Sequence, residues 1–129
     1  MKSLTIRSAE AYEIHTRLKK IENRNWRASV SWMRHSIVII AKREKSRKVR
    51  YPLERHMRGH IIGLAKLNHV RNATDCENLP GFNSSYKYHY YIEDYIPLNK
   101  FIEYKGKQKQ SRKITDLKVK EELLRLGRK

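Results

Sequence analysis

The stretch SIVIIA, residues 36–41, places four β-branched aliphatic residues in a row within a chain of 129 residues. This composition is typical of a strand that is covered on both faces, because a strand with one exposed face alternates apolar and polar residues. The stretch therefore predicts the central strand of the fold. A chain of this length is long enough for one compact core and short for two, so we expect a single domain.

The segments on either side predict a small sheet with a helix beside it. Upstream, Leu4 and Ile6 alternate with polar residues, and apolar residues then recur at helical spacing over residues 9–18, behind Ser8 as the expected N-cap. Downstream, further strands are expected at residues 60–67, 86–92 and 95–104, with Pro97 limiting the pairing of the last. The order predicts an α+β fold, a small mixed or antiparallel β-barrel with a helix after the first strand.

The end of the chain, residues 105–129, is expected to pack on the domain formed by residues 1–104. Residues 105–113 read as a basic tail. An amphipathic helix is then predicted to begin at Thr115 and to end at Gly127, with one apolar stripe along it.

The stretch KKIENRNWR, residues 19–27, is almost wholly polar and directly follows the predicted helix. An extended conformation would put Glu22, Arg24 and Trp26 on one face. Lys19 and Arg24 suit phosphate or a base carbonyl, Glu22 suits an exocyclic amine, and the Trp26 indole suits base stacking. The structural alternative is a Glu22–Arg24 ion pair at a strand edge, with Trp26 filling the core.

The charge balance favours a polyanionic partner. Thirty Lys and Arg residues stand against 13 Asp and Glu, a formal net charge of +17, which repels itself unless an anion is present. We therefore expect RNA or single-stranded DNA as the partner. No stretch is apolar enough to span a bilayer and the start lacks a signal-peptide core, so we expect no membrane association and a cytoplasmic, intracellular location.

Several other residues are candidates for binding. Tyr88 lies on a predicted strand face that is either a stacking platform or part of the core. His56 and His60 are four apart but lack further ligands at metal spacing, and the single Cys76 lacks a catalytic signature, so neither a metal nor a cofactor is expected. The predicted basic approach surface consists of Arg27, Lys42, Arg43, Lys45, Arg47 and Lys48.

The order of LTIR, a helix, K-x-I-E-N-R-x-W-R, a β-branched strand and HIIGLAKL resembles the ASCH domain family, over residues 2–104. The resemblance implies a PUA-like barrel with a cleft between the barrel and the first helix that takes RNA, DNA or a modified nucleoside. The family usually has a glycine just before its motif lysine. In this sequence Arg17 and Leu18 precede Lys19.

The resemblance also implies two hydrolytic activities as alternatives, a ribonuclease on single-stranded RNA and an N4-acetylcytidine amidohydrolase. Lys19 matches the catalytic lysine of the amidohydrolases, but Glu22 stands where they have threonine. Glu22, or one of Asp75 and Glu77 further on, would assist Lys19. A third alternative is a non-catalytic interaction protein that docks by charge or through its last helix; the sequence does not give the oligomeric state.

Overall fold

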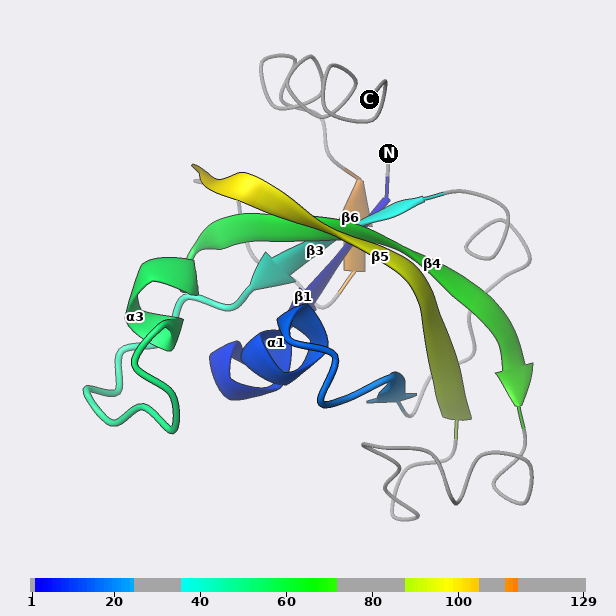
Figure 1. The fold of residues 1–129 in the computed structure, drawn as a ribbon, viewed down its shortest axis with the longest axis horizontal. Helices are drawn as coiled ribbons and strands as arrows, with labels where there is room; N and C mark the ends of the chain where they lie inside the picture. The colour runs from blue at the N-terminus through cyan, green and yellow to red at the C-terminus, as the bar shows by residue number, and fades with distance from the viewer. Residues whose placement is uncertain (1, 25–35, 72–87, 105–110, 114–129) are drawn as a thin grey trace.

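The computed structural model of the chain describes residues 2–24, 36–71, 88–104 and 111–113 (Figure 1). Its elements are β1 (Lys2–Ile6), α1 (Ser8–His15), β2 (Ile21–Arg24), β3 (Ile37–Ala41), α3 (Glu54–Met57), β4 (His60–Arg71), β5 (Tyr88–Glu103) and β6 (Ser111–Lys113). The predicted C-terminal helix lies outside the described residues.

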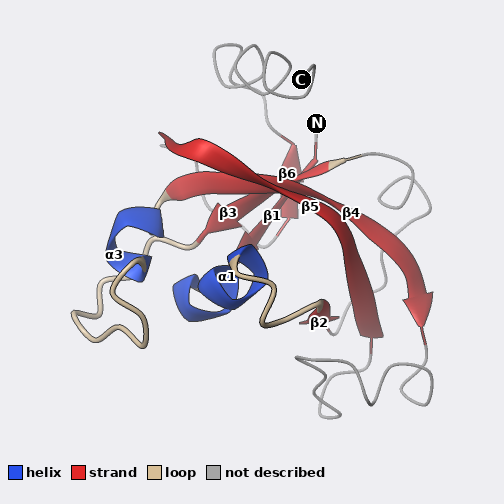
Figure 2. Cartoon of the chain, viewed as in Figure 1, coloured by secondary structure: helices blue, strands red, loops and turns tan. Residues whose placement is uncertain are grey.

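The strands form one mixed sheet of six in the order β2-β5-β4-β3-β1-β6. β1 and β3 run parallel, and the other neighbouring pairs are antiparallel. The long strands β4 and β5 curve over α1 (Figure 2). The predicted α+β class, with a helix after the first strand, is confirmed. The closed barrel is not, because β2 and β6 remain the two edges of the sheet formed by the described strands.

β3 is the buried central strand that its sequence predicts. All five of its residues are buried, and its neighbours are β4 on one side and β1 on the other. Ile37, Ile39 and Ala41 join one apolar cluster, whereas Val38 and Ile40 join a second. Successive side chains of β3 therefore pack into two apolar clusters on opposite faces of the sheet. This explains why no polar residue interrupts the run.

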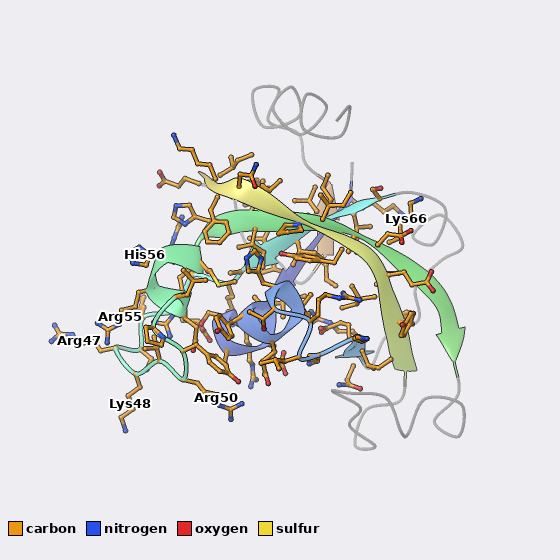
Figure 3. The ribbon with its side chains drawn as sticks, viewed as in Figure 1. Arg47, Lys48, Arg50, Arg55, His56 and Lys66 are labelled. Carbon is orange, nitrogen blue, oxygen red and sulfur yellow. The ribbon has the colours of Figure 1, made fainter. Side chains whose placement is uncertain are left out.

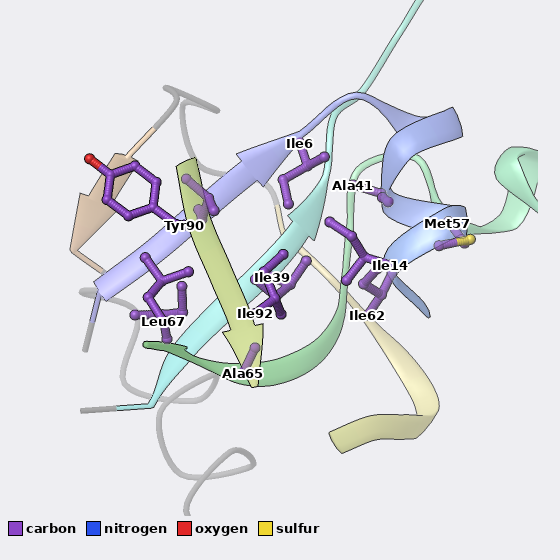
Figure 4. Close-up of a cluster of buried hydrophobic side chains, with 13 residues drawn as sticks. Ile6, Ile14, Ile39, Ala41, Met57, Ile62, Ala65, Leu67, Tyr90 and Ile92 are labelled. Atoms are coloured by element: carbon purple, nitrogen blue, oxygen red, sulfur yellow. The ribbon is translucent and has the colours of Figure 1, made fainter. Parts of the chain in front are cut away.

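The larger cluster lies between the sheet and α1. It is completed by Ala11 and Ile14 of the helix and by residues of β1, β4 and β5, several of which are labelled in Figure 4. The apolar positions that predicted the helix are therefore the ones that attach it to the sheet. Figure 1 shows α1 under the arch of β4 and β5.

The start and end of α1 differ from the prediction. The helix ends at His15 rather than Leu18, and Leu18 is 59% exposed. Ser8 is the first helical residue, with Arg7 as the N-cap and no side-chain cap from either. Instead the Ser8 N–H donates to the Glu44 carboxylate at 3.2 Å, so an acid from a distant loop neutralises the positive end of the helix. The prediction that Ser8 is the N-cap was wrong. The acceptor for the first N–H group of the helix is Glu44, which lies too far along the sequence to be recognised from the local pattern.

The second half of the sheet is more continuous than predicted. One strand, β5, replaces the two expected at 86–92 and 95–104, although Asp94 has a φ of 49° within it. Pro97 is tolerated because it faces Gly63 of β4, in a part of β5 that β2 does not reach. The segment read as a basic tail supplies β6, which pairs with β1.

Gly63 is required by close packing rather than by backbone conformation. A Cβ added there would lie 2.5 Å from the Tyr95 hydroxyl oxygen and 2.6 Å from its ring. The same hydroxyl donates to the Ile62 carbonyl oxygen at 3.3 Å and lies 2.6 Å from Nδ1 of His15. Tyr95 therefore links α1 to β4 only while position 63 carries no side chain.

We expect Gly63→Ala to lower the free energy of unfolding by about 1–3 kcal/mol, because the methyl group overpacks the Tyr95 site. Urea unfolding measures the change, and combining Gly63→Ala with Tyr95→Ala provides the control. The penalty of the methyl group should be largely absent in the Tyr95→Ala background. A cost below about 0.5 kcal/mol in the otherwise unchanged protein would contradict this assignment.

Candidate functional site

The chain passes from α1 to β2 through a left-handed residue. Arg17 has a φ of 63°, a conformation that costs a residue with a side chain about 1–2 kcal/mol. Its N–H donates to the Ile14 carbonyl oxygen at 3.1 Å, and its guanidinium donates to the Ile92 carbonyl oxygen at 3.2 Å. The chain therefore reverses direction at an arginine that is hydrogen-bonded to β5. This reversal brings Lys19 next to the sheet.

Lys19 is held at the start of β2 against the helix. Its side chain is only 8% exposed, and Nζ lies 3.3 Å from Oε1 of Glu10. Its N–H also donates to the Glu13 carbonyl oxygen at 3.0 Å. Glu10 is 41% exposed, so this pair forms the outer side of the cluster. Glu10 was not among the residues predicted for the site.

Glu22 and Arg24 lie on the same side of β2, as alternation predicts. Oε1 of Glu22 is 2.9 Å from Nε of Arg24, and the two side chains are 3% and 10% exposed. The contact is an ion pair without an aligned hydrogen bond from Nε. The other carboxylate oxygen, Oε2, is buried and has no hydrogen-bond partner among the described residues. Glu22 therefore keeps one strong acceptor unused.

Burial raises the pKa of Glu22 above its usual value of 4.5, while the charges of Arg24 and Lys19 oppose the rise. The negative charge of Glu10 adds to it. Four ionisable groups therefore interact here, two acidic and two basic, and Lys19, Glu22 and Arg24 are almost fully buried. We refer to Glu10, Lys19, Glu22 and Arg24 as the β2 charge cluster.

Arg24 also connects distant parts of the sheet. Its NH2 group donates to the Thr5 carbonyl oxygen of β1 at 2.9 Å. β2 is the first strand in the sheet order and β1 is the fifth, so this bond spans the concave side of a strongly curled sheet. The structural alternative raised for Glu22 and Arg24 is thus realised, and it coexists with the unused acceptor on Glu22.

The residues of the predicted basic approach surface that the structure describes lie on one loop and differ in their contacts. Lys42, Lys45, Arg47 and Lys48 are exposed on the loop between β3 and α3. Figure 3 shows Arg47 and Lys48 projecting from this loop, at the same end of the molecule as α3. Arg43 is exposed as well, but its guanidinium donates to the Tyr104 carbonyl oxygen at 3.2 Å and lies against Gly59. Its role is to join the loop to the end of β5.

The remaining predicted residues are placed only in part. Tyr88 begins β5, and its Cα is paired with that of Arg24, so it lies next to the β2 charge cluster in the ladder. Trp26, Arg27, Asp75, Cys76 and Glu77 lie outside the described residues. The stacking role of Trp26 and the approach role of Arg27 therefore remain predictions.

The two histidines considered as metal ligands are held separately. His60 Nδ1 lies 2.9 Å from the Arg58 carbonyl oxygen, and His56 is exposed on α3. Within the described ranges, no three His, Cys, Asp or Glu side chains gather in a way that could hold a metal ion. The helices in the same ranges include none with the length and hydropathy needed to cross a bilayer.

Comparison with solved structures identifies the architecture. Crystal structures of ZmASCH from Zymomonas mobilis, unsubstituted and as two single-residue variants, match 97% of this chain and 94–96% of theirs, with TM-scores of 0.64–0.66 and 13% sequence identity. The chain has the ASCH fold. At this identity the likeness concerns the fold alone. A scan of protein-family profiles finds no match, and a search of curated proteins finds none either.

We expect the raised pKa of Glu22 to make stability fall with rising pH. The folded chain binds this proton more tightly than the unfolded chain, so the contribution of Glu22 is full below about pH 4.5 and declines as pH rises through the higher folded pKa. Glu22→Gln, which cannot titrate, is the reference.

Urea unfolding of both proteins between about pH 4 and pH 8 measures this difference. Relative to Glu22→Gln, the unsubstituted protein should lose stability across the interval. A relative gain instead would mean that Arg24 and Lys19 outweigh burial and lower the pKa of Glu22.

Proposed function

We propose that the protein binds nucleic acid, either RNA or single-stranded DNA, and that the β2 charge cluster recognises one base. The observation that carries the proposal is the buried Glu22 carboxylate, whose Oε2 has no hydrogen-bond partner among the described residues and whose charge interacts with that of Lys19. A buried acceptor without a donor costs free energy that a bound N–H group would recover. A cluster built only for stability gains nothing from leaving that oxygen unmatched.

The charges of the cluster favour a neutral ligand group over a phosphate. Glu10 and Glu22 balance Lys19 and Arg24, so the site has no net charge when all four are ionised. A base edge has no net charge and presents both donors and acceptors. Glu22 would accept from an exocyclic amine and the Lys19 ammonium would donate to a neighbouring carbonyl or ring nitrogen. Arg24, which is occupied by Glu22 and by Thr5, would orient the carboxylate.

This arrangement favours bases that carry an exocyclic amine. Adenine, cytosine and guanine have one, whereas uracil and thymine do not. The large positive excess, +17 for the whole chain, would supply affinity for the backbone without regard to sequence. The proposal thus assigns base preference to the β2 charge cluster and backbone affinity to the positive charge of the chain. Experiments can measure these two contributions separately.

We expect the protein to bind oligo(A) or oligo(C) more tightly than oligo(U), and Glu22→Ala to remove most of this preference. One lost hydrogen bond to a charged acceptor corresponds to about 1.5–3 kcal/mol, or roughly a tenfold to hundredfold loss of affinity. Fluorescence anisotropy with labelled oligonucleotides at fixed salt measures it, with Lys66→Ala as the control on the exposed side of β4. Equal affinities of the unsubstituted protein for all three would contradict base recognition.

A second candidate is a hydrolase of the same site, acting as a ribonuclease or as an N4-acetylcytidine amidohydrolase. The observation in its favour is a poorly exposed lysine in the same cluster as Glu22, whose pKa is raised by burial, because a raised pKa makes a carboxylate a stronger proton acceptor. Lys19 would act as the base or activator and Glu22 would assist.

Incubation with single-stranded RNA and with acetylated cytidine distinguishes the two candidates. The hydrolase predicts product that Lys19→Ala abolishes while oligonucleotide binding persists, and the binding protein predicts intact substrates. If Lys19→Ala and Glu22→Ala alter neither binding nor products, the remaining alternative is a non-catalytic interaction protein.

A further inference from the structure

The loop between β3 and α3 is built around the buried carboxylate of Glu54. Oε2 of Glu54 accepts from the N–H groups of Arg50 and Tyr51, both at 2.7 Å, and Oε1 accepts from the Ser8 hydroxyl at 2.7 Å. Burial alone would raise the pKa of Glu54, but these hydrogen bonds and the charge of Arg58 together lower it. Glu54 therefore stays ionised at neutral pH and fixes the end of the loop to α1.

Arg58 holds the middle of the same loop from the inside. One terminal nitrogen donates to the Ser46 carbonyl oxygen, the other donates to the Lys48 carbonyl oxygen at 3.1 Å, and Nε donates to the Ser8 hydroxyl at 3.0 Å. Its charge lies 3.6 Å from Glu44 and 3.9 Å from Glu54. A single guanidinium thus orders two carbonyl groups of the loop, and the acids near it are turned inward.

The cations of the loop are turned outward. Lys45, Arg47 and Lys48 are exposed and have no ion-pair partner in the described part of the chain. Arg55 of α3 is also exposed, and its guanidinium donates to the Arg47 carbonyl oxygen at 3.2 Å, which brings helix and loop together. Figure 3 shows Arg47, Lys48 and Arg55 at one end of the molecule. Like charges concentrated in this way attract a polyanion.

We propose that Lys45, Arg47, Lys48 and Arg55 form a preordered surface for the sugar–phosphate backbone of single-stranded nucleic acid, and that Arg58 is the positioning residue that shapes it. The inference deepens the proposed function and rests on it. It keeps Lys45, Arg47 and Lys48 of the predicted approach surface and adds Arg55 and Arg58.

The position of the surface relative to the β2 charge cluster supports this partner. Arg50, at the end of the loop, pairs with Glu13 of α1 at 3.8 Å, and Lys19 pairs with Glu10. Glu10 and Glu13 are three residues apart and therefore share one helix face. The backbone surface and the base cluster thus flank the same face of α1, so a single strand contacts both by following that face. Because the loop is already ordered, binding would not carry the cost of ordering it.

The test compares two double variants that remove the same charge. Arg47→Gln with Lys48→Gln alters the proposed surface, and Lys66→Gln with Lys100→Gln alters exposed lysines on β4 and β5. Binding of a labelled single-stranded RNA is measured by anisotropy over a range of salt concentrations. We expect the first variant to reduce the slope of log affinity against log salt by about 1.4, since each phosphate contact on a single strand contributes about 0.7. The second should leave the slope unchanged.

Arg58→Lys tests the positioning role at constant charge. One ammonium cannot replace the planar fork that reaches both loop carbonyls and Ser8, so we expect the slope to fall although the net charge is the same. A role in stability alone would lower the midpoint of urea unfolding without changing the slope below the unfolding transition. An unchanged slope for Arg58→Lys would therefore refute the positioning role.

The outcomes separate this inference from the base-recognition proposal. If both double variants reduce the slope equally, the surface assignment is wrong, while a base preference that depends on Glu22 would still support the proposed function. If the loop variant alone reduces the slope but Glu22→Ala changes no base preference, the backbone surface stands and base recognition fails. Failure of the unsubstituted protein to bind any oligonucleotide overturns both. Loop-dependent binding to phosphatidylserine vesicles without RNA binding would overturn the choice of partner.

Discussion

The guanidinium of Arg24 joins parts of the structure that strand pairing leaves apart. It contacts Glu22 on its own strand and donates across the concave side of the sheet to the Thr5 carbonyl oxygen of β1. β2 is a short strand at the edge of the sheet formed by the described strands, and within that sheet its ladder connects it to β5. The position of β2 relative to β1 therefore depends on this buried contact, whereas the contacts of Lys19 with Glu10 and with the Glu13 carbonyl oxygen hold the start of the strand against α1.

The same constraint accounts for the chemistry of the cluster. A carboxylate brought to 2% exposure needs neighbouring cations, and Arg24 and Lys19 provide them from the strand and from the turn that precedes it. Lys19 reaches its place because Arg17 reverses the chain in a left-handed conformation and bonds to β5. The polar stretch after α1 is thus ordered by ionic contacts, where most strands of this sheet are ordered by apolar packing.

The β3–α3 loop, which contacts the start of α1, shows the opposite arrangement of charge. Around β2 the acids and cations face one another in the interior, and their sum is neutral. Around the β3–α3 loop, Glu44 and Glu54 face inward to Ser8 and to backbone N–H groups, and the cations are left on the surface. The β2 charge cluster is therefore suited to an uncharged polar group, and the β3–α3 loop is suited to phosphate. The two regions flank the helix face that carries Glu10 and Glu13.

Much of this architecture could be predicted from local pattern. The β-branched run of β3, the alternation in β1, the apolar face of α1 and the pairing of Glu22 with Arg24 all follow from periodicity, because each is decided by neighbours within a few residues. Contacts between remote residues could not be predicted this way. Glu44 as the cap of α1, Arg24 bonding to Thr5, and Arg58 inside the loop join positions that no local period relates.

The most direct test of the central claim is carbon-13 NMR of the glutamate carboxyl groups during titration with single-stranded RNA that contains cytosine or adenine. If the cluster recognises a base, the Glu22 carboxyl resonance shifts in proportion to the fraction bound, while that of Glu54, already saturated with internal hydrogen bonds, stays in place. Saturation of binding with the Glu22 resonance unmoved would show that the strand lies elsewhere and that the buried cluster serves the fold alone.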